Sequence, residues 1–141
     1  MTNIVKLFIF SIISTLIFWG CSSATEPEPE SGPDNEVVKL LTNGMWEICD
    51  SNGVIDTTDR RGKYKYNSDY TGTMYMLWEG SEGEWDVFAT FTWKLEDSST
   101  KLVYSSQSGS GTATIENLTD TELILFWIEQ DTRQYYTNVP D

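Results

Sequence analysis

Hydrophobic and polar residues alternate one by one in the middle of the chain. Between residues 85 and 95 every second position is apolar or aromatic: Trp85, Val87, Ala89, Phe91, Trp93 and Leu95. A period of two is typical of a β-strand with one buried face, because successive side chains point to opposite sides of a sheet. We therefore expect a long strand over 85–95, with these side chains in the core.

Similar segments recur through residues 36–141, which are enough for one small domain. Short runs rich in aromatic and β-branched residues predict seven more strands, at 45–50, 62–67, 73–79, 101–106, 111–117, 122–129 and 133–138. Only 36–41 has the apolar spacing of a helical turn. The short gaps suit hairpins, so we predict an all-β domain, an eight-stranded antiparallel meander that stacks as a sandwich or closes as a barrel.

The N-terminal residues predict export. Lys6 precedes an apolar run over 7–19, which is shorter than the roughly 20 residues of a membrane span but suits the core of a secretory signal. The run ends in Phe18-Trp19-Gly20-Cys21, which resembles the lipobox of bacterial lipoproteins. This resemblance implies that residues 1–20 are removed and that Cys21 carries the acyl chains. An ordinary signal, cleaved after the Ser-Ser-Ala of residues 22–24, is the alternative.

Residues 21–35 predict a flexible, acidic, Pro-rich tether between the anchor and the domain. Ser22, next to the lipidated Cys, resembles the default signal for sorting to the outer membrane. The acidic residues Glu26, Glu28 and Glu30 resemble surface-export signals of Bacteroidetes-type bacteria. We therefore expect a protein of the cell envelope, anchored by lipid to the outer membrane and facing the periplasm or the cell surface.

Charge and residue types narrow the classes of function. The formal net charge is −13, and it becomes −14 when the signal and its Lys6 are removed, which opposes binding to nucleic acid. Histidine is absent, and with it the commonest general base and metal ligand. No catalytic motif is present, so we expect no enzyme, cofactor or metal. Cys49, flanked by acidic residues, is expected to be a core or half-buried residue rather than a nucleophile.

An ordered series of motifs resembles a family. Gly44-Met45-Trp46, just after the amphipathic 37–41 segment, resembles the Gly-x-Trp of the lipocalin-like barrels. The 69–72 turn, Phe91-Thr92-Trp93 and the 115–123 run resemble the lipocalin-like lipoprotein domains of Bacteroidetes. The resemblance covers nearly all of residues 38–137. It implies a closed barrel with Gly44 and Trp46 as a plug at one end, and it implies that Arg133 stacks on Trp46.

Function depends on what fills the barrel, because eight strands enclose a space that side chains just fill or that holds one small ligand. The candidate lining residues are Met74, Met76, Trp78, Phe91, Trp93, Tyr104 and Trp127. They would form an adaptable apolar pocket, with Tyr104 as its polar group, or else a packed core. We therefore expect an anchored barrel that binds a small apolar or amphipathic ligand without catalysis. The alternative is an accessory lipoprotein of a surface complex, with a filled core and a protein partner.

Overall fold

The computed structural model describes residues 35–58, 60–79 and 83–141. The expected signal peptide, the lipidation site Cys21 and residues 22–34 of the tether lie outside the described residues. The elements follow the predicted order closely: α1 (Glu36–Leu41), β1 (Met45–Cys49), β2 (Arg61–Tyr66), β3 (Thr71–Leu77), β4 (Asp86–Glu96), β5 (Lys101–Ser106), β6 (Gly109–Leu118), β7 (Glu122–Trp127) and β8 (Thr132–Val139).

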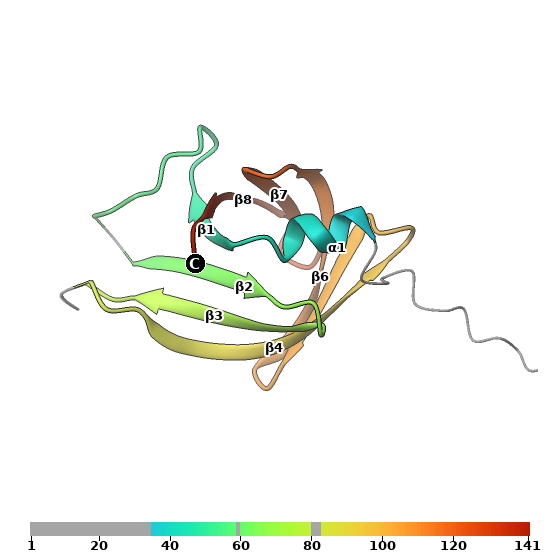
Figure 1. The fold of residues 1–141 in the computed structure, drawn as a ribbon, viewed down its shortest axis with the longest axis horizontal. Coiled ribbons are helices and arrows are strands. Elements are labelled where there is room, and N and C mark those ends of the chain that lie inside the picture. The colour runs from blue at the N-terminus through green and yellow to red at the C-terminus, as the bar shows by residue number, and fades with distance from the viewer. Residues whose placement is uncertain (1–34, 59, 80–82) are drawn as a thin grey trace, which may run out of the picture.

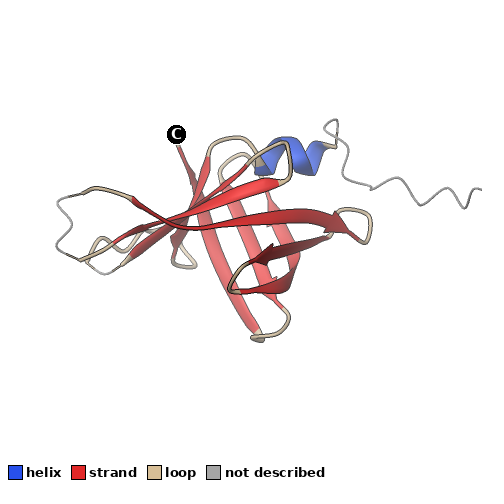
Figure 2. Ribbon diagram, turned by 90° about the horizontal axis from the view of Figure 1, so that it is seen from below, coloured by secondary structure: helices blue, strands red, loops and turns tan. Residues whose placement is uncertain are grey.

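The eight strands form a closed antiparallel barrel in sequence order (Figures 1 and 2). Each strand pairs with the next one along the chain, and β8 closes the barrel by pairing with β1 from Met45–Val139 to Cys49–Tyr135. Closure leaves no unpaired sheet edge, which is the usual weakness of an open meander. The all-β barrel prediction is confirmed, and the sandwich is excluded.

Helix α1 lies at one end of the barrel, which we call the closed end. The side chain of Asn35 caps the helix by accepting a hydrogen bond from the Val37 amide at 2.8 Å. Val38 and Leu41 are buried against the barrel. The last turn is also tied to the first strand, because the indole Nε1–H of Trp46 donates to the carbonyl of Leu41 at 2.9 Å.

Large side chains fill the half of the barrel next to this helix. The buried residues there include Trp46, Trp93, Leu95, Leu102, Ala113, Leu123 and Leu125. Trp46 has no exposed surface, and Trp93 fixes its indole by donating to the carbonyl of Thr71 at 2.9 Å. Buried aromatic rings of this size dominate the energetics of a small core. The space that remains for a ligand lies toward the other end, which we call the open end.

A β-bulge corrects the predicted alternation of β4. Met74 of β3 pairs with Ala89, but the next residue, Tyr75, pairs with Val87, so Phe88 is an extra residue in β4. One inserted residue exchanges the two faces of a strand. Phe91, Trp93 and Leu95 are therefore buried as predicted, whereas Val87 is 63% exposed. Trp85 lies before the strand and contacts the outer surface, where Lys63 Nζ is 4.3 Å from its ring centre.

Candidate ligand cavity

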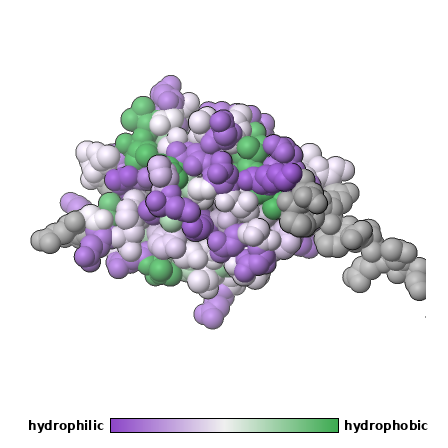
Figure 3. Space-filling model, viewed as in Figure 1, coloured by the Kyte–Doolittle hydropathy of each residue, from purple (hydrophilic) through white to green (hydrophobic). Residues whose placement is uncertain are grey.

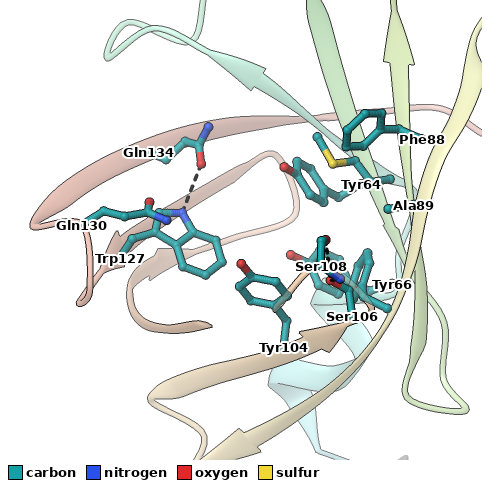
Figure 4. Close-up of a pocket in the computed structure, with 12 residues that line it drawn as sticks. Tyr64, Tyr66, Phe88, Ala89, Tyr104, Ser106, Ser108, Trp127, Gln130 and Gln134 are labelled. Carbon is teal, nitrogen blue, oxygen red and sulfur yellow. Dashed lines mark hydrogen bonds between the residues drawn. The ribbon is translucent and has the colours of Figure 1, made fainter. Parts of the chain in front are cut away.

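A cavity of ≈ 250 Å³ occupies the open half of the barrel (Figure 4). Six of the eight strands contribute to it. Its walls are Tyr64 and Tyr66 from β2, Met74 from β3, Phe88, Ala89 and Phe91 from β4, Tyr104 and Ser106 from β5, Ser108 from the β5–β6 turn, Trp127 from β7, Gln130 from the β7–β8 turn and Gln134 from β8.

Two glycines allow the aromatic walls to lie where they do. Gly111 is the cross-strand partner of Tyr104, and a Cβ at Gly111 would lie 2.5 Å from Cε1 of that ring. Gly72 is the partner of Phe91, and a Cβ there would overlap the Phe91 ring. A glycine that faces an aromatic residue lets the ring cover the neighbouring strand. The sequence thus places the rings of Tyr104 and Phe91 across the barrel interior.

The aromatic rings support one another. Tyr64 makes edge contacts with Tyr136 at 5.7 Å and with Phe91 at 6.3 Å between ring centres. On the other wall, Tyr104 and Trp127 pack edge to face at 5.3 Å. Such edge contacts are worth about 0.5–1.5 kcal/mol each beyond the burial of area. The walls are therefore held in place before any ligand enters.

Gln134 joins two of the walls. Its Oε1 accepts a hydrogen bond from Trp127 Nε1–H at 3.1 Å (Figure 4). It accepts another from the Tyr136 hydroxyl at 2.7 Å. Because an indole has only a donor, the amide oxygen must face Trp127. This orientation leaves the amide –NH₂ of Gln134 outside both bonds. Gln134 therefore fixes the indole of Trp127 and retains two donors of its own.

No charged side chain lines the cavity among residues 35–58, 60–79 and 83–141, although the chain as a whole carries a formal net charge of −13. Burial, together with the nearby Tyr104, raises the pKa of Tyr64 to about 12, and burial also raises the pKa of Tyr66. Both phenols are therefore neutral at physiological pH. Tyr64, Tyr66 and Tyr104 form no hydrogen bond through their hydroxyls to any residue in the described parts of the chain.

Four of the seven side chains predicted to line a pocket do line this cavity: Met74, Phe91, Tyr104 and Trp127. Trp93 lies deeper and belongs to the packed half of the core. Met76 also lies outside the lining, half-buried beside Gly62. Trp78 is wrong as an interior residue, because β3 ends at Leu77; its ring is 38% exposed and lies 5.7 Å from the Arg60 guanidinium.

Sequence reasoning missed eight lining residues: Tyr64, Tyr66, Phe88, Ala89, Ser106, Ser108, Gln130 and Gln134. The alternation of Lys and Tyr over 63–66 in a predicted strand was a sufficient signal for the two tyrosines. Phe88 depends on the bulge. Ser108 and Gln130 lie in turns, where the period of two carries no information about which way a side chain points.

The two plug residues lie at the closed end of the barrel. Gly44 has φ +91°, a conformation that favours glycine, and a Cβ there would lie 2.5 Å from Oδ1 of Asn138. This sharp entry into β1 places Trp46 under α1, where it is fully buried. Both residues hold the fold and lie away from the cavity.

The stacking of Arg133 on Trp46 is wrong. Trp46 pairs with Asn138, whereas Arg133 lies five positions earlier on β8 and pairs with Phe126. Five residues of strand span about 17 Å, and an odd separation puts the two side chains on opposite faces. Arg133 instead forms a two-point ion pair with Glu116 on the outer surface, which lowers the pKa of the Glu116 carboxyl. Glu116 is the extra residue of a bulge in β6.

Cys49 is half-buried near the end of β1. Burial raises the pKa of its thiol, and the neighbouring carboxylates of Asp50, Glu122 and Glu47 raise it further. A thiol with a raised pKa is a poor nucleophile at neutral pH.

Residues 35–58, 60–79 and 83–141 contain no group of three or more Cys, Asp or Glu side chains placed to hold a metal ion. Within the same ranges, no helix has the length and apolar character needed to cross a membrane.

The barrel is similar to an NMR structure of a protein from Bacteroides uniformis ATCC 8492. The two share 16% sequence identity with a TM-score of 0.51, and the similarity covers 72% of this chain and 92% of that chain. At this level of identity the likeness establishes a shared fold. No protein-family model matches the sequence, and no curated protein matches it.

Proposed function

We propose that this chain is a lipid-anchored lipoprotein of the cell envelope whose lipocalin-like barrel binds a small amphipathic molecule without catalysis. The observation that carries the binding role is the cavity of ≈ 250 Å³ in the open half of the barrel, with walls of aromatic rings and hydroxyl and amide groups. Ligand sites in proteins are typically concave and mostly apolar, with a few placed polar groups. The anchor rests on the sequence that ends at Cys21.

Several features of the barrel support binding rather than a solid core. Ala89, Ser106 and Ser108 place small side chains where large ones would fill the space. The hydroxyl of Tyr104 points into the open part of the barrel in Figure 4. A ligand that supplies partners for such hydroxyls gains hydrogen bonds without displacing bonds within the protein. The packed half below Phe91 serves as a floor.

The binding role is tested by native mass spectrometry of the chain purified from its own host. We expect a reproducible bound mass of a size that fits one small molecule. A protein that is bare in every preparation would contradict the carrier role. The anchor is tested separately by metabolic labelling with an acyl-chain probe. Label should appear on the wild-type chain and be lost in Cys21→Ala; equal labelling of both would contradict lipidation at Cys21.

A protein partner is the second candidate function, and one observation favours it. Three apolar residues around the β3–β4 hairpin are exposed: Trp78 (38%), Val87 (63%) and Phe88 (56%). The ring centres of Trp78 and Phe88 lie 6.2 Å apart. The surface otherwise shows mainly hydrophilic residues and small separate hydrophobic areas on the face seen in Figure 3. Exposed aromatic groups of this kind mark interaction surfaces. Val87→Ser would weaken capture of a partner and leave a bound small molecule in place.

A further inference from the structure

We infer that the cavity selects an uncharged six-membered ring that carries hydrogen-bonding groups at its edge, and that it rejects long acyl chains and ionised ligands. This inference rests on the proposed binding function and names the chemical class of its ligand. Sugar rings and hydroxylated or amidated aromatic rings share this chemistry. The size, floor, charge and polar groups of the cavity each restrict the ligand.

Size is the first restriction. An apolar cavity of roughly 150 Å³ in a protein core holds one benzene molecule, and drug-sized ligands occupy roughly 300–1,000 Å³. The volume of ≈ 250 Å³ lies between these values. It therefore fits one ring with its substituents.

The floor is the second restriction. Phe91 and Tyr66 pack at 5.5 Å between ring centres, and Tyr66 packs against Trp93 at 5.6 Å directly beyond them. All three side chains are buried. A long acyl chain would have to displace this cluster to reach the closed end. Forcing extra volume into a well-packed core strains its side chains and backbone, so the cavity favours a ligand that stops at Phe91.

Charge is the third restriction. Among the residues that the structure describes, no lysine, arginine, aspartate or glutamate lines the cavity. An ionised carboxylate or ammonium placed there would lose water and gain no opposite charge, which is costly. The negative field of the whole chain adds to the cost for an anion. A neutral ligand avoids this desolvation cost.

The polar groups define the edge of the ligand. Around the aromatic walls lie the hydroxyls of Tyr64, Tyr104 and Ser106 and the amides of Gln130 and Gln134 (Figure 4). Hydroxyls both donate and accept, and the amides add further donors and acceptors. The Ser106 hydroxyl already bonds within the β5–β6 turn, and Gln134 Oε1 already accepts two hydrogen bonds. A bare hydrocarbon ring would offer no partner to the hydroxyls of Tyr64 and Tyr104 or to the amide –NH₂ of Gln134, whereas ring hydroxyls or amides would satisfy them.

The test follows the indole N–H signals of the full chain by two-dimensional NMR during titration with matched probes. One set shares a ring and differs in charge: 4-hydroxybenzamide, 4-hydroxybenzoate and 4-hydroxybenzylamine. Methyl glucoside and its glucuronate counterpart form the sugar pair, and laurate is the acyl probe. The Trp127 indole reports on the cavity, and the Trp46 indole at the closed end is the internal control.

We expect at least one neutral ring to shift the Trp127 signal, with an affinity at least tenfold above that of its charged counterparts and of laurate. Tyr104→Phe, which keeps the ring and removes the hydroxyl, should weaken that binding, whereas Tyr75→Phe on the outer face should not. Ser106→Lys adds a positive charge to the lining, so it should reduce the difference in affinity between 4-hydroxybenzamide and 4-hydroxybenzoate.

Tighter binding of laurate, of the carboxylate or of the amine would overturn the inference and leave the proposed carrier role in place. Failure of every neutral ring to move Trp127 at millimolar concentration would also overturn it. The carrier role itself is tested independently by native mass spectrometry of the chain purified from its own host.

Discussion

The ring of Tyr104 lies over Gly111 of the neighbouring strand, in the space that any larger residue at position 111 would occupy. This pair builds one wall of the cavity. Gly111→Ala should therefore push the ring toward the cavity and lower stability by about 1–3 kcal/mol. Urea denaturation measures the loss. Gly62→Ala is the matched control, because a Cβ there meets the flexible ends of Ile48, Met76 and Met74, at 3.2, 3.3 and 3.9 Å, and no aromatic ring. Equal losses in the two variants would contradict the role of the Tyr104–Gly111 pair.

Trp46 should dominate the stability of the closed end. Trp46→Ala removes a fully buried ring and the hydrogen bond to Leu41, so we expect a loss of about 3–5 kcal/mol in the free energy of unfolding. Trp78→Ala removes a ring of the same type from an exposed position and should cost far less. If the two variants melted at the same temperature, Trp46 would not be the plug of the barrel.

Arg133→Ala separates the observed outer-surface ion pair from the stacking that the family resemblance implied. Exposed ion pairs contribute little to the stability of a protein, because water and salt screen the attraction between the charges. We therefore expect a melting temperature close to that of the wild type, and the same result for Glu116→Gln. A large fall for Arg133→Ala without a fall for Glu116→Gln would mean that the arginine has a second, buried contact.

Glu47 and Arg61 form an ion pair whose carboxylate is buried, unlike the exposed pair of Arg133 and Glu116. The Glu47 carboxylate is nearly buried, its Oε1 lies 2.5 Å from Arg61 Nε, and the Trp85 ring centre lies 5.3 Å from the same guanidinium. Arg61→Met should leave the carboxylate buried without its partner, which costs about 3 kcal/mol, the lower end of the range for buried pairs, because the Arg61 side chain is 25% exposed. Adding Glu47→Gln should recover most of that loss in chemical denaturation. A double variant as unstable as Arg61→Met alone would contradict this account.

Alkaline pH should weaken the fold through its buried tyrosines. Burial raises the pKa of Tyr64 from an ordinary value near 10 to about 12, and it raises the pKa values of Tyr66 and Tyr136 as well. The unfolded chain therefore loses these protons first. The stability that they contribute is complete below pH 10 and falls between pH 10 and 12, by about 1.4 kcal/mol per pH unit for each tyrosine. Denaturation at several pH values should show a shallower fall for Tyr64→Phe than for Tyr135→Phe.

The sequence predicted the barrel because the determinants of the barrel are local. Alternating side chains and short turns define each strand, and Gly44 and Trp46 mark the entry into the first one. The cavity depends on two features that no local pattern encodes. The bulge at Phe88 reverses the faces at the start of β4, and the pairing of Phe91 and Tyr104 with glycines depends on the register between strands. The error at Arg133 has the same origin, since register alone separates it from Trp46.

The carrier role requires that the open half of the barrel holds a small molecule. The most direct measurement is native mass spectrometry on host-purified wild type beside two matched variants, Ala89→Phe, which places a ring in the cavity, and Thr90→Phe, which places it on the outer face. We predict a bound mass on the wild type and on Thr90→Phe, and its loss from a folded Ala89→Phe. The same mass on all three proteins, or on none of them, would contradict the account.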